Sequence, residues 1–225
     1  SDRLMEFPLG LFGIALATVT LPYLSRLWAS EERREFTETL EWSMRIALLI
    51  AVPAAIGLVV LAAPLIVTLF HGGEFGERSV RMTVLALQAY AVGLVGFSFV
   101  KVLAPAFFAR EDTRTPVRIG IIALVANLVL GSTSAWYLTS SGFAGPHVGL
   151  AGATSIAALL NAALLYRGLR RAGVLVHAPG WGILLARVAL ANLAMIAVLW
   201  ALHRDVAWWL SAGLLDRVTW LGVAV

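Results

Sequence analysis

The 225-residue sequence contains no cysteine and few charged residues, and each scarcity excludes a class of protein. Without cysteine, the chain has neither a disulfide framework nor a thiolate metal site. Charged residues make up 13% of the sequence and hydrophobic residues 60%, whereas soluble domains carry about 25% charged residues. The composition therefore predicts an integral membrane protein rather than a soluble domain.

Motifs for metal, phosphate or nucleic-acid chemistry are also missing. The four histidines fall at the ends of apolar runs or in loops, without metal-ligand spacing: His71, His147, His177 and His203. No glycine-rich phosphate loop precedes a helix. The net charge of +4 needs no nucleic-acid partner, because the basic residues lie between apolar spans and act as topology signals. We expect neither an enzyme nor a nucleic-acid-binding protein.

What the sequence does contain is a series of seven apolar segments. They cover residues 3–24, 42–70, 80–108, 117–138, 148–166, 183–202 and a stretch from about 206 onward. Helices of this length cross a bilayer core of ~30 Å, whereas an open sheet could not satisfy its backbone in lipid. The predicted fold is an all-α, polytopic transmembrane helical bundle. Because the sequence starts in a charged cluster without methionine and ends in an apolar run, we expect a piece of a longer protein, truncated at both ends.

The arginines are distributed unevenly between the two sides of this bundle. Eleven of them lie in the loops after the first, third and fifth spans, or just beyond these loops, and four lie in the alternate loops. Cytoplasmic loops carry the excess of lysine and arginine. The chain is therefore predicted to enter its first span from outside, at Arg3.

Two stretches give expectations about local structure. Ser30 is suited to cap a short surface helix whose first turn carries Glu31 and Glu32. Small residues at helical spacing in the fifth span, including Gly149 and Gly152, predict close packing against a neighbouring helix.

Ionisable residues near or inside the membrane are the first candidates for a functional site. Asp2, Arg3 and Glu6 lie at the mouth of the first span, with Arg3 and Glu6 one helical turn apart on the same face. Charge in a membrane is costly and marks either a functional site or a structural one. From the chemistry alone, a binding site and an interfacial anchor in which Arg3 snorkels to headgroups remain equally open.

Two further polar residues lie inside spans. Lys101 has no acid within its span, so its amine either snorkels toward Arg110 or faces a wet cavity that holds an anionic ligand; we favour the cavity. Asn127 is the one amide at depth. We expect an interhelical hydrogen bond from it, with ion coordination as the alternative.

Several motifs resemble the MurJ (MviN) proteins, the lipid II flippases of the MOP exporter superfamily. The matching motifs are Asp2-Arg3-Leu4-Met5-Glu6-Phe7-Pro8 with the apolar run after it, Gly73-Glu74-Phe75, Val100-Lys101-Val102-Leu103-Ala104-Pro105, Thr115-Pro116-Val117-Arg118 and Pro179-Gly180-Trp181. By this resemblance the chain is the C-terminal half, transmembrane helices eight to fourteen. Residues 1–171 would supply five helices of the C-terminal lobe, and residues 172–225 two additional helices that form a lipid-tail groove.

The resemblance also implies a function. Such a protein moves lipid II, an undecaprenyl-pyrophosphate-linked disaccharide-pentapeptide, from the inner to the outer leaflet of the bacterial cytoplasmic membrane by alternating access. Asp2, Arg3 and Glu6 would face a central cavity completed by the N-terminal half, and Lys101 would contribute to substrate binding. No cofactor is expected; coupling to Na⁺ or to the membrane potential stays open, since Asn127 is followed one turn later by Gly131 rather than an acid. The alternatives are another exporter of the superfamily, namely a polysaccharide flippase or a drug/cation antiporter, and a membrane scaffold that transports nothing.

Overall fold

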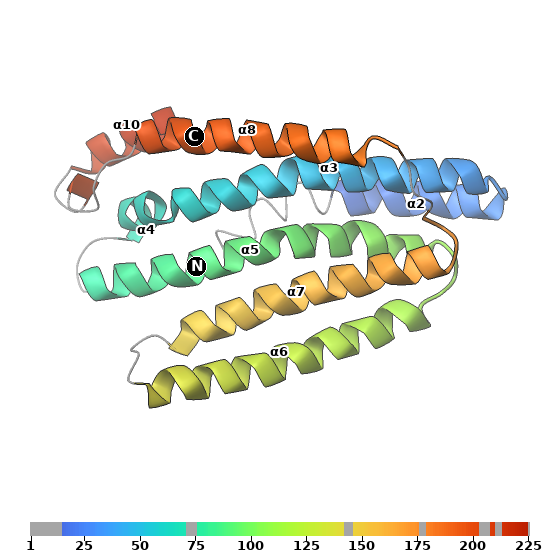
Figure 1. Cartoon of the computed structure of the whole chain (residues 1–225), viewed down its shortest axis with the longest axis horizontal. Coiled ribbons are helices and arrows are strands. Elements are labelled where there is room, and N and C mark those ends of the chain that lie inside the picture. The colour runs from blue at the N-terminus through green and yellow to red at the C-terminus, as the bar shows by residue number, and fades with distance from the viewer. Residues whose placement is uncertain are drawn as a thin grey trace.

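The apolar runs of this chain fold as long helices that lie side by side. The structure, a computed structural model, describes residues 15–70, 76–141, 146–175, 179–202, 208–209 and 213–224. Within these residues the helices are α2 (Ala15–Ala29), α3 (Arg33–Val60), α4 (Ala62–Phe70), α5 (Glu77–Phe108), α6 (Arg114–Ser140), α7 (Pro146–Arg171), α8 (Trp181–Ala201) and α10 (Leu214–Ala224). The long helices follow the long axis of the molecule (Figure 1). The predicted all-α bundle is confirmed.

Five helices of the described part are long and apolar enough to cross a membrane: α3, α5, α6, α7 and α8. They correspond to the second through sixth predicted spans. The start of the first predicted span lies outside the described residues, which include its end in α2. The seventh predicted span is represented by α10, whose 11 residues begin at Leu214.

The second span differs from its prediction in two ways. Its helix begins at Arg33 rather than near Trp42, and it is interrupted at Leu61 between α3 and α4. Proline clashes with the carbonyl four residues earlier, which for Pro64 is that of Val60, the last residue of α3. Pro64 then falls in the first turn of α4, where its missing N–H costs least.

The prediction that Ser30 caps a short surface helix is wrong. The Ser30 hydroxyl donates to the carbonyl of Arg26 at 3.0 Å, so Ser30 closes α2 instead of starting a helix. Phe36 and Leu40 are fully buried in the main core cluster. Burial of these two side chains draws the segment into the bundle as the first turns of α3, because apolar surface removed from water stabilises the packed arrangement.

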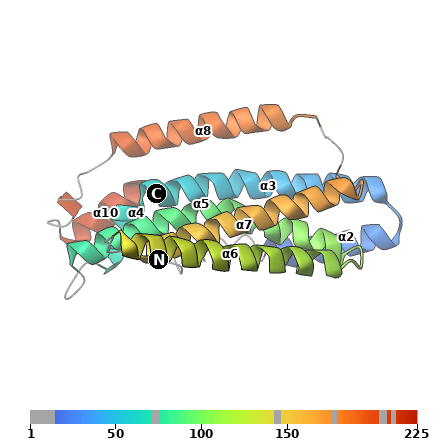
Figure 2. The same cartoon turned by 60° about the horizontal axis from the view of Figure 1, so that its bottom comes forward.

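Helix α5 lies at the centre of the bundle and packs against α2, α3, α4 and α7, while α6 covers α7. Among the described residues, helix α8 packs mainly on α3, and it lies to one side of the remaining bundle (Figure 2). The main core cluster collects large apolar side chains of α2, α3, α5 and α7, among them Leu24, Phe36, Phe107 and Leu165. The bundle is therefore built around α5, with α8 as a peripheral helix.

Small residues bring α5 and α7 into close contact. A Cβ atom on Gly96 would lie 2.7 Å from backbone atoms of Ala158 and Leu159, and one on Gly93 would lie 2.6 Å from the Ser155 hydroxyl oxygen. That hydroxyl donates to the carbonyl of Ala89 in α5 at 2.6 Å. Glycine at these positions lets the two backbones approach, as in many membrane helix pairs.

The predicted packing of the fifth span is confirmed at Gly149, where an added Cβ would lie 2.8 Å from the Ser134 hydroxyl oxygen of α6. At Gly152 no heavy atom of the described residues lies within 4 Å of such a Cβ. Close packing therefore involves Gly149 but not Gly152.

The connections α2–α3, α5–α6 and α7–α8 all lie at one end of the bundle (Figure 1). Arginines flank them in the adjoining helix ends, so this end is called here the basic end. Helices α2, α5 and α7 end there with the same cap, in which an N–H bonds the carbonyl five residues earlier. The pairs are Glu32 to Leu27, Asp112 to Phe107 and Val174 to Leu169. The residue before each of these N–H donors is left-handed, as a Schellman cap requires, with φ of 61° at Glu31, 61° at Glu111 and 71° at Gly173.

Candidate functional site between α2 and α3

The residues predicted from the sequence are distributed over several helices. Asp2, Arg3 and Glu6 lie outside the described residues, so their roles stay predictions. Lys101 lies in α5, about two turns before the end of the helix, and its side chain is half-buried. Its chain neighbours Val102 and Leu103 belong to the main core cluster. This position agrees with either predicted role of the amine, snorkelling or cavity lining.

Asn127 makes the predicted interhelical contact. The Thr154 hydroxyl of α7 donates to the Asn127 side-chain oxygen of α6 at 3.4 Å. In the part of the chain that the structure describes, no group of three or more histidines and carboxylates is placed to hold a metal ion. The Asn127 amide thus joins α6 to α7.

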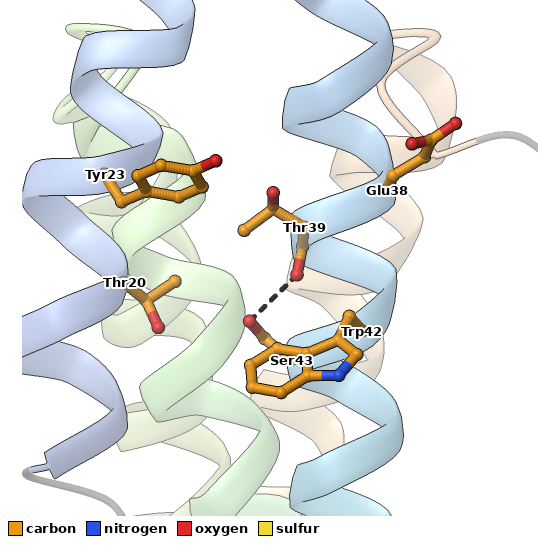
Figure 3. A pocket seen from close by; sticks show the side chains of 6 residues that line it. All are labelled: Thr20, Tyr23, Glu38, Thr39, Trp42 and Ser43. Atoms are coloured by element: carbon orange, nitrogen blue, oxygen red, sulfur yellow. Dashed lines mark hydrogen bonds between the residues drawn. The ribbon is translucent and has the colours of Figure 1, made fainter.

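A cavity of about 340 Å³ lies between α2 and α3. Helix α2 contributes Thr20 and Tyr23, and α3 contributes Glu38, Thr39, Trp42 and Ser43 (Figure 3). The spacing explains the arrangement, because residues three or four apart share one face of a helix. Two such faces from neighbouring helices therefore border the space between them.

The lining side chains differ in depth. Ser43 and Thr20 are buried, and the Ser43 hydroxyl donates to the carbonyl of Thr39 at 2.9 Å. The two aromatic side chains form the open walls, with 42% of Tyr23 and 58% of Trp42 exposed. The cavity thus has a hydroxyl-bearing floor and an aromatic mouth.

Charges lie at the rim of this cavity. The Arg34 Nε donates to a Glu38 carboxylate oxygen at 2.8 Å, with both side chains largely exposed. The guanidinium carbon of Arg26 lies 5.7 Å from the centroid of the Tyr23 ring, within the range of a cation–π interaction. One carboxylate and two guanidinium groups therefore border the mouth.

The basic end is held together by contacts between its connections. The Trp28 ring contacts two guanidinium groups. The guanidinium carbon of Arg33 lies 3.3 Å from the ring centroid, and that of Arg110 lies 5.0 Å from it. These contacts join the α2–α3 turn to the α5–α6 turn, and cation–π contacts of this type contribute about 0.5–1 kcal/mol at exposed sites.

One stripe of α3, formed by Thr37, Glu41 and Arg45, faces the connection to α8. The Thr37 hydroxyl donates to the carbonyl of Val174 at 2.9 Å, and Arg45 donates to the carbonyl of Pro179 at 3.1 Å. Glu41 lies between these two residues on the stripe and is 9% exposed. Sequence reasoning placed Glu41 in a loop; the spacing of four from Thr37 through Glu41 to Arg45 is the signal that could have identified it.

Sequence reasoning also missed the cavity between α2 and α3. Thr20 and Ser43 were read as parts of apolar runs, and Trp42 as the start of the second run. The available signal was the recurrence of hydroxyl and aromatic residues three or four apart in two neighbouring spans. Pairing of the two faces depends on tertiary packing, which this spacing alone does not determine.

The fold and the grouping of basic connections define the class: a multi-pass, α-helical membrane protein. A family model described as lipid II flippase MurJ matches residues 1–218. The chain belongs to the MurJ family.

Relatives named as probable lipid II flippases support this assignment. The chain is 47% identical to a protein of Vibrio cholerae serotype O1 over 96% of its length, covering 40% of that protein. It is 42% identical to one of Haemophilus influenzae over 98% of its length, covering 43% of that protein. The chain thus spans about two fifths of the length of these curated relatives.

A solved structure gives the same fold. It is described as lipid II flippase MurJ in an inward closed conformation, and it superposes with a TM-score of 0.71. The likeness covers 99% of this chain and 43% of the other, at 23% sequence identity. At that identity the likeness concerns the fold alone.

Proposed function

We propose that the protein to which this chain belongs is a lipid II flippase that carries the peptidoglycan precursor from the inner to the outer leaflet of the bacterial cytoplasmic membrane. The observation that carries the proposal is the match of the lipid II flippase family over residues 1–218. The relative at 47% identity, named a probable lipid II flippase, supports it. Moving a lipid between leaflets breaks no covalent bond, so the activity is transport rather than catalysis.

This chain would form the C-terminal half of the transporter. Residues 1–171 supply one lobe, residues 172–225 supply two additional helices beside it, and an N-terminal lobe is the partner across a central cavity. The two lobes rock so that the cavity opens first to one side and then to the other. The separate position of α8, packed on α3 beside the bundle, agrees with helices added to a lobe (Figure 2).

The charged groups of the chain would bind the anionic headgroup. A guanidinium fork grips phosphate oxygens with two parallel hydrogen bonds, which suits Arg3 to the pyrophosphate. Asp2 and Glu6 would hold basic side chains while the site is empty, and the Lys101 amine would add positive potential.

Arg3→Ala tests the proposal. Removing a charge-assisted hydrogen bond costs ~1.5–3 kcal/mol, about a tenfold to hundredfold loss of binding. The variant should fail to complement a strain depleted of its flippase while inserting into the membrane normally. Arg3→Lys should restore part of the activity, because a point charge lacks the fork.

The matched control is Arg171→Ala, which removes an exposed arginine at the end of α7 and should complement fully. Binding of lipid II to the purified protein, expressed from its full reading frame, provides the direct measurement. Unchanged affinity in Arg3→Ala would remove Arg3 from the site. Failure of the unmodified protein to complement and to bind lipid II would reject the proposed function.

A further inference from the structure

The cavity between α2 and α3 has a lining unlike the rest of the chain. Hydrophobic residues make up 60% of the sequence, yet among the described residues the lining contains no aliphatic side chain, no lysine and no arginine. Every member carries a hydroxyl, an aromatic ring or a carboxylate: Thr20, Tyr23, Glu38, Thr39, Trp42 and Ser43. A lining of this composition limits the chemistry of the ligand.

Two kinds of ligand fit this lining poorly. A lipid acyl chain gains most from aliphatic walls, and none of the described lining residues supplies one. A phosphate group needs cationic donors in direct contact, but the guanidinium groups of Arg26 and Arg34 stand at the rim, and Arg34 is bound to Glu38 at 2.8 Å.

A sugar ring fits better. Its axial C–H face is apolar and packs on an aromatic ring, while its hydroxyl groups both donate and accept hydrogen bonds. Tyrosine and tryptophan provide a large apolar face with a polar group at one edge. Hydroxyl and carboxylate oxygens supply the complementary acceptors, and threonine, serine and tyrosine supply donors as well.

We propose that this cavity is a saccharide subsite, which holds one sugar ring of the lipid-linked disaccharide. This assignment rests on the proposed flippase function and refines it. Trp42, 58% exposed at the mouth, is the stacking platform. The hydroxyls of Tyr23 and Thr39 face the space between the helices and contact the sugar hydroxyls (Figure 3).

The size and the surroundings of the cavity agree with this role. A volume of about 340 Å³ lies at the lower end of the range of small-molecule sites. The guanidinium carbon of Arg26, at the rim, lies 5.7 Å from the centroid of the Tyr23 ring, which is part of the lining. A sugar seated on Trp42 would therefore have its linked phosphate near a guanidinium group at the basic end, which by the proposed orientation faces the inner leaflet.

Trp42→Ala tests the subsite in the purified protein expressed from its full reading frame. Two probes separate the sugar from the rest of the substrate: lipid II itself, and undecaprenyl pyrophosphate, which has no sugar. Loss of the stacking platform should weaken binding of lipid II about tenfold and change binding of undecaprenyl pyrophosphate less than about twofold. Trp42→Phe, which retains an aromatic face, should stay within about threefold of the unmodified protein for both probes.

Trp136→Ala is the matched control, because Trp136 is 75% exposed on α6 and lies outside the cavity; it should bind both probes normally. Equal affinity of Trp42→Ala and the unmodified protein for lipid II would overturn the subsite while leaving the flippase proposal intact. An equal loss for both probes would also overturn it, since the sugar would then not be what Trp42 contacts. If the unmodified protein binds no lipid II, both proposals fail.

Discussion

Lys101 illustrates what one ionisable side chain can do inside an apolar helix. Lys101 is half-buried in α5, next to core residues, and a charge inside an apolar span is costly unless it reaches water or a partner. Long lysine stems reach such partners over several ångströms, so snorkelling and cavity lining differ only in the direction that the stem takes. Substitution distinguishes the two roles.

If the amine serves the substrate cavity, Lys101→Ala should reduce flipping severalfold, while Lys101→Arg should retain much of it because the charge is kept. Transport of fluorescent lipid II in vesicles containing the full-length protein provides the measurement. An alanine variant that is expressed normally and transports at the full rate would identify Lys101 as an interfacial anchor.

Asp112 caps α6 at the basic end. Its carboxylate accepts the Thr115 backbone N–H at 3.0 Å. Hydrogen bonds from the Thr115 side chain and backbone hold the pKa of Asp112 below its ordinary value. A carboxyl group whose pKa is lowered on folding stabilises the folded state above its unfolded pKa, and this contribution is lost as the pH falls through the folded pKa.

Asp112→Ala should therefore lower the thermal midpoint at pH 7 by about 2–4 °C, the usual effect of losing a cap in a protein of this size. The difference from the unmodified protein should shrink as the pH falls below the ordinary range of an aspartate. Asp112→Asn should keep most of the cap without this pH dependence. Differential scanning fluorimetry in detergent provides the midpoints, and a gap of constant size between pH 7 and pH 3 would contradict the assignment.

At the scale of the helices, the interface between α5 and α7 depends on glycine. A methyl group at Gly96 would lie 2.7 Å from the α7 backbone, which cannot move aside as a flexible side chain can. Gly57 in α3 offers a comparison, because an added Cβ there meets no heavy atom of the described residues within 4 Å.

Gly96→Ala should destabilise the protein by about 1–3 kcal/mol through overpacking. Gly57→Ala should be neutral or stabilising by up to about 1 kcal/mol, since alanine is the better helix former. The two midpoints, measured side by side in detergent, test the interface. Equal midpoints for the two variants would mean that α5 and α7 separate at little cost.

The long helices were predictable because each apolar run is long enough to cross a bilayer, where a single span must be helical. The spans that became α5, α6, α7 and α8 begin and end close to their predicted bounds. The beginning of α3 was not predictable in this way, because the stretch after Ser30 is charged and joins the bundle only through burial of Phe36 and Leu40. The break at Leu61 could have been anticipated, since Pro64 removes the bond that would continue α3.

The candidate site was predictable only in part, for a related reason. Asn127 stood out because an amide in lipid needs a partner, and Thr154 supplies it across the α6–α7 interface. The cavity lining did not stand out, because threonine, serine and tryptophan are ordinary residues of membrane spans. Whether these residues line a cavity depends on which helix packs against α2. The residue spacing within one span does not determine that packing.

At the scale of the whole molecule, the distribution of arginine orients the bundle. Helix α6 separates two exposed positions, Thr113 before its start and Ser141 after its end. With 27 residues at ~1.5 Å each, the two lie ~40 Å apart, enough to place them on opposite sides of a bilayer. Thr113 belongs to the basic end, which the excess of arginine predicts to be cytoplasmic.

A cysteine at Ser141 should react with a membrane-impermeant thiol reagent in intact cells, whereas a cysteine at Thr113 should react only after the cells are permeabilised. The chain has no cysteine of its own, so each introduced thiol is the single one in this chain. The expectation follows from the eleven-to-four distribution of arginines between the two sides, because translocating a basic loop is unfavourable. Labelling of Thr113→Cys but not Ser141→Cys in intact cells would reverse the orientation. The basic end and the cavity between α2 and α3 would then open toward the outer leaflet, where a flippase releases its substrate instead of receiving it.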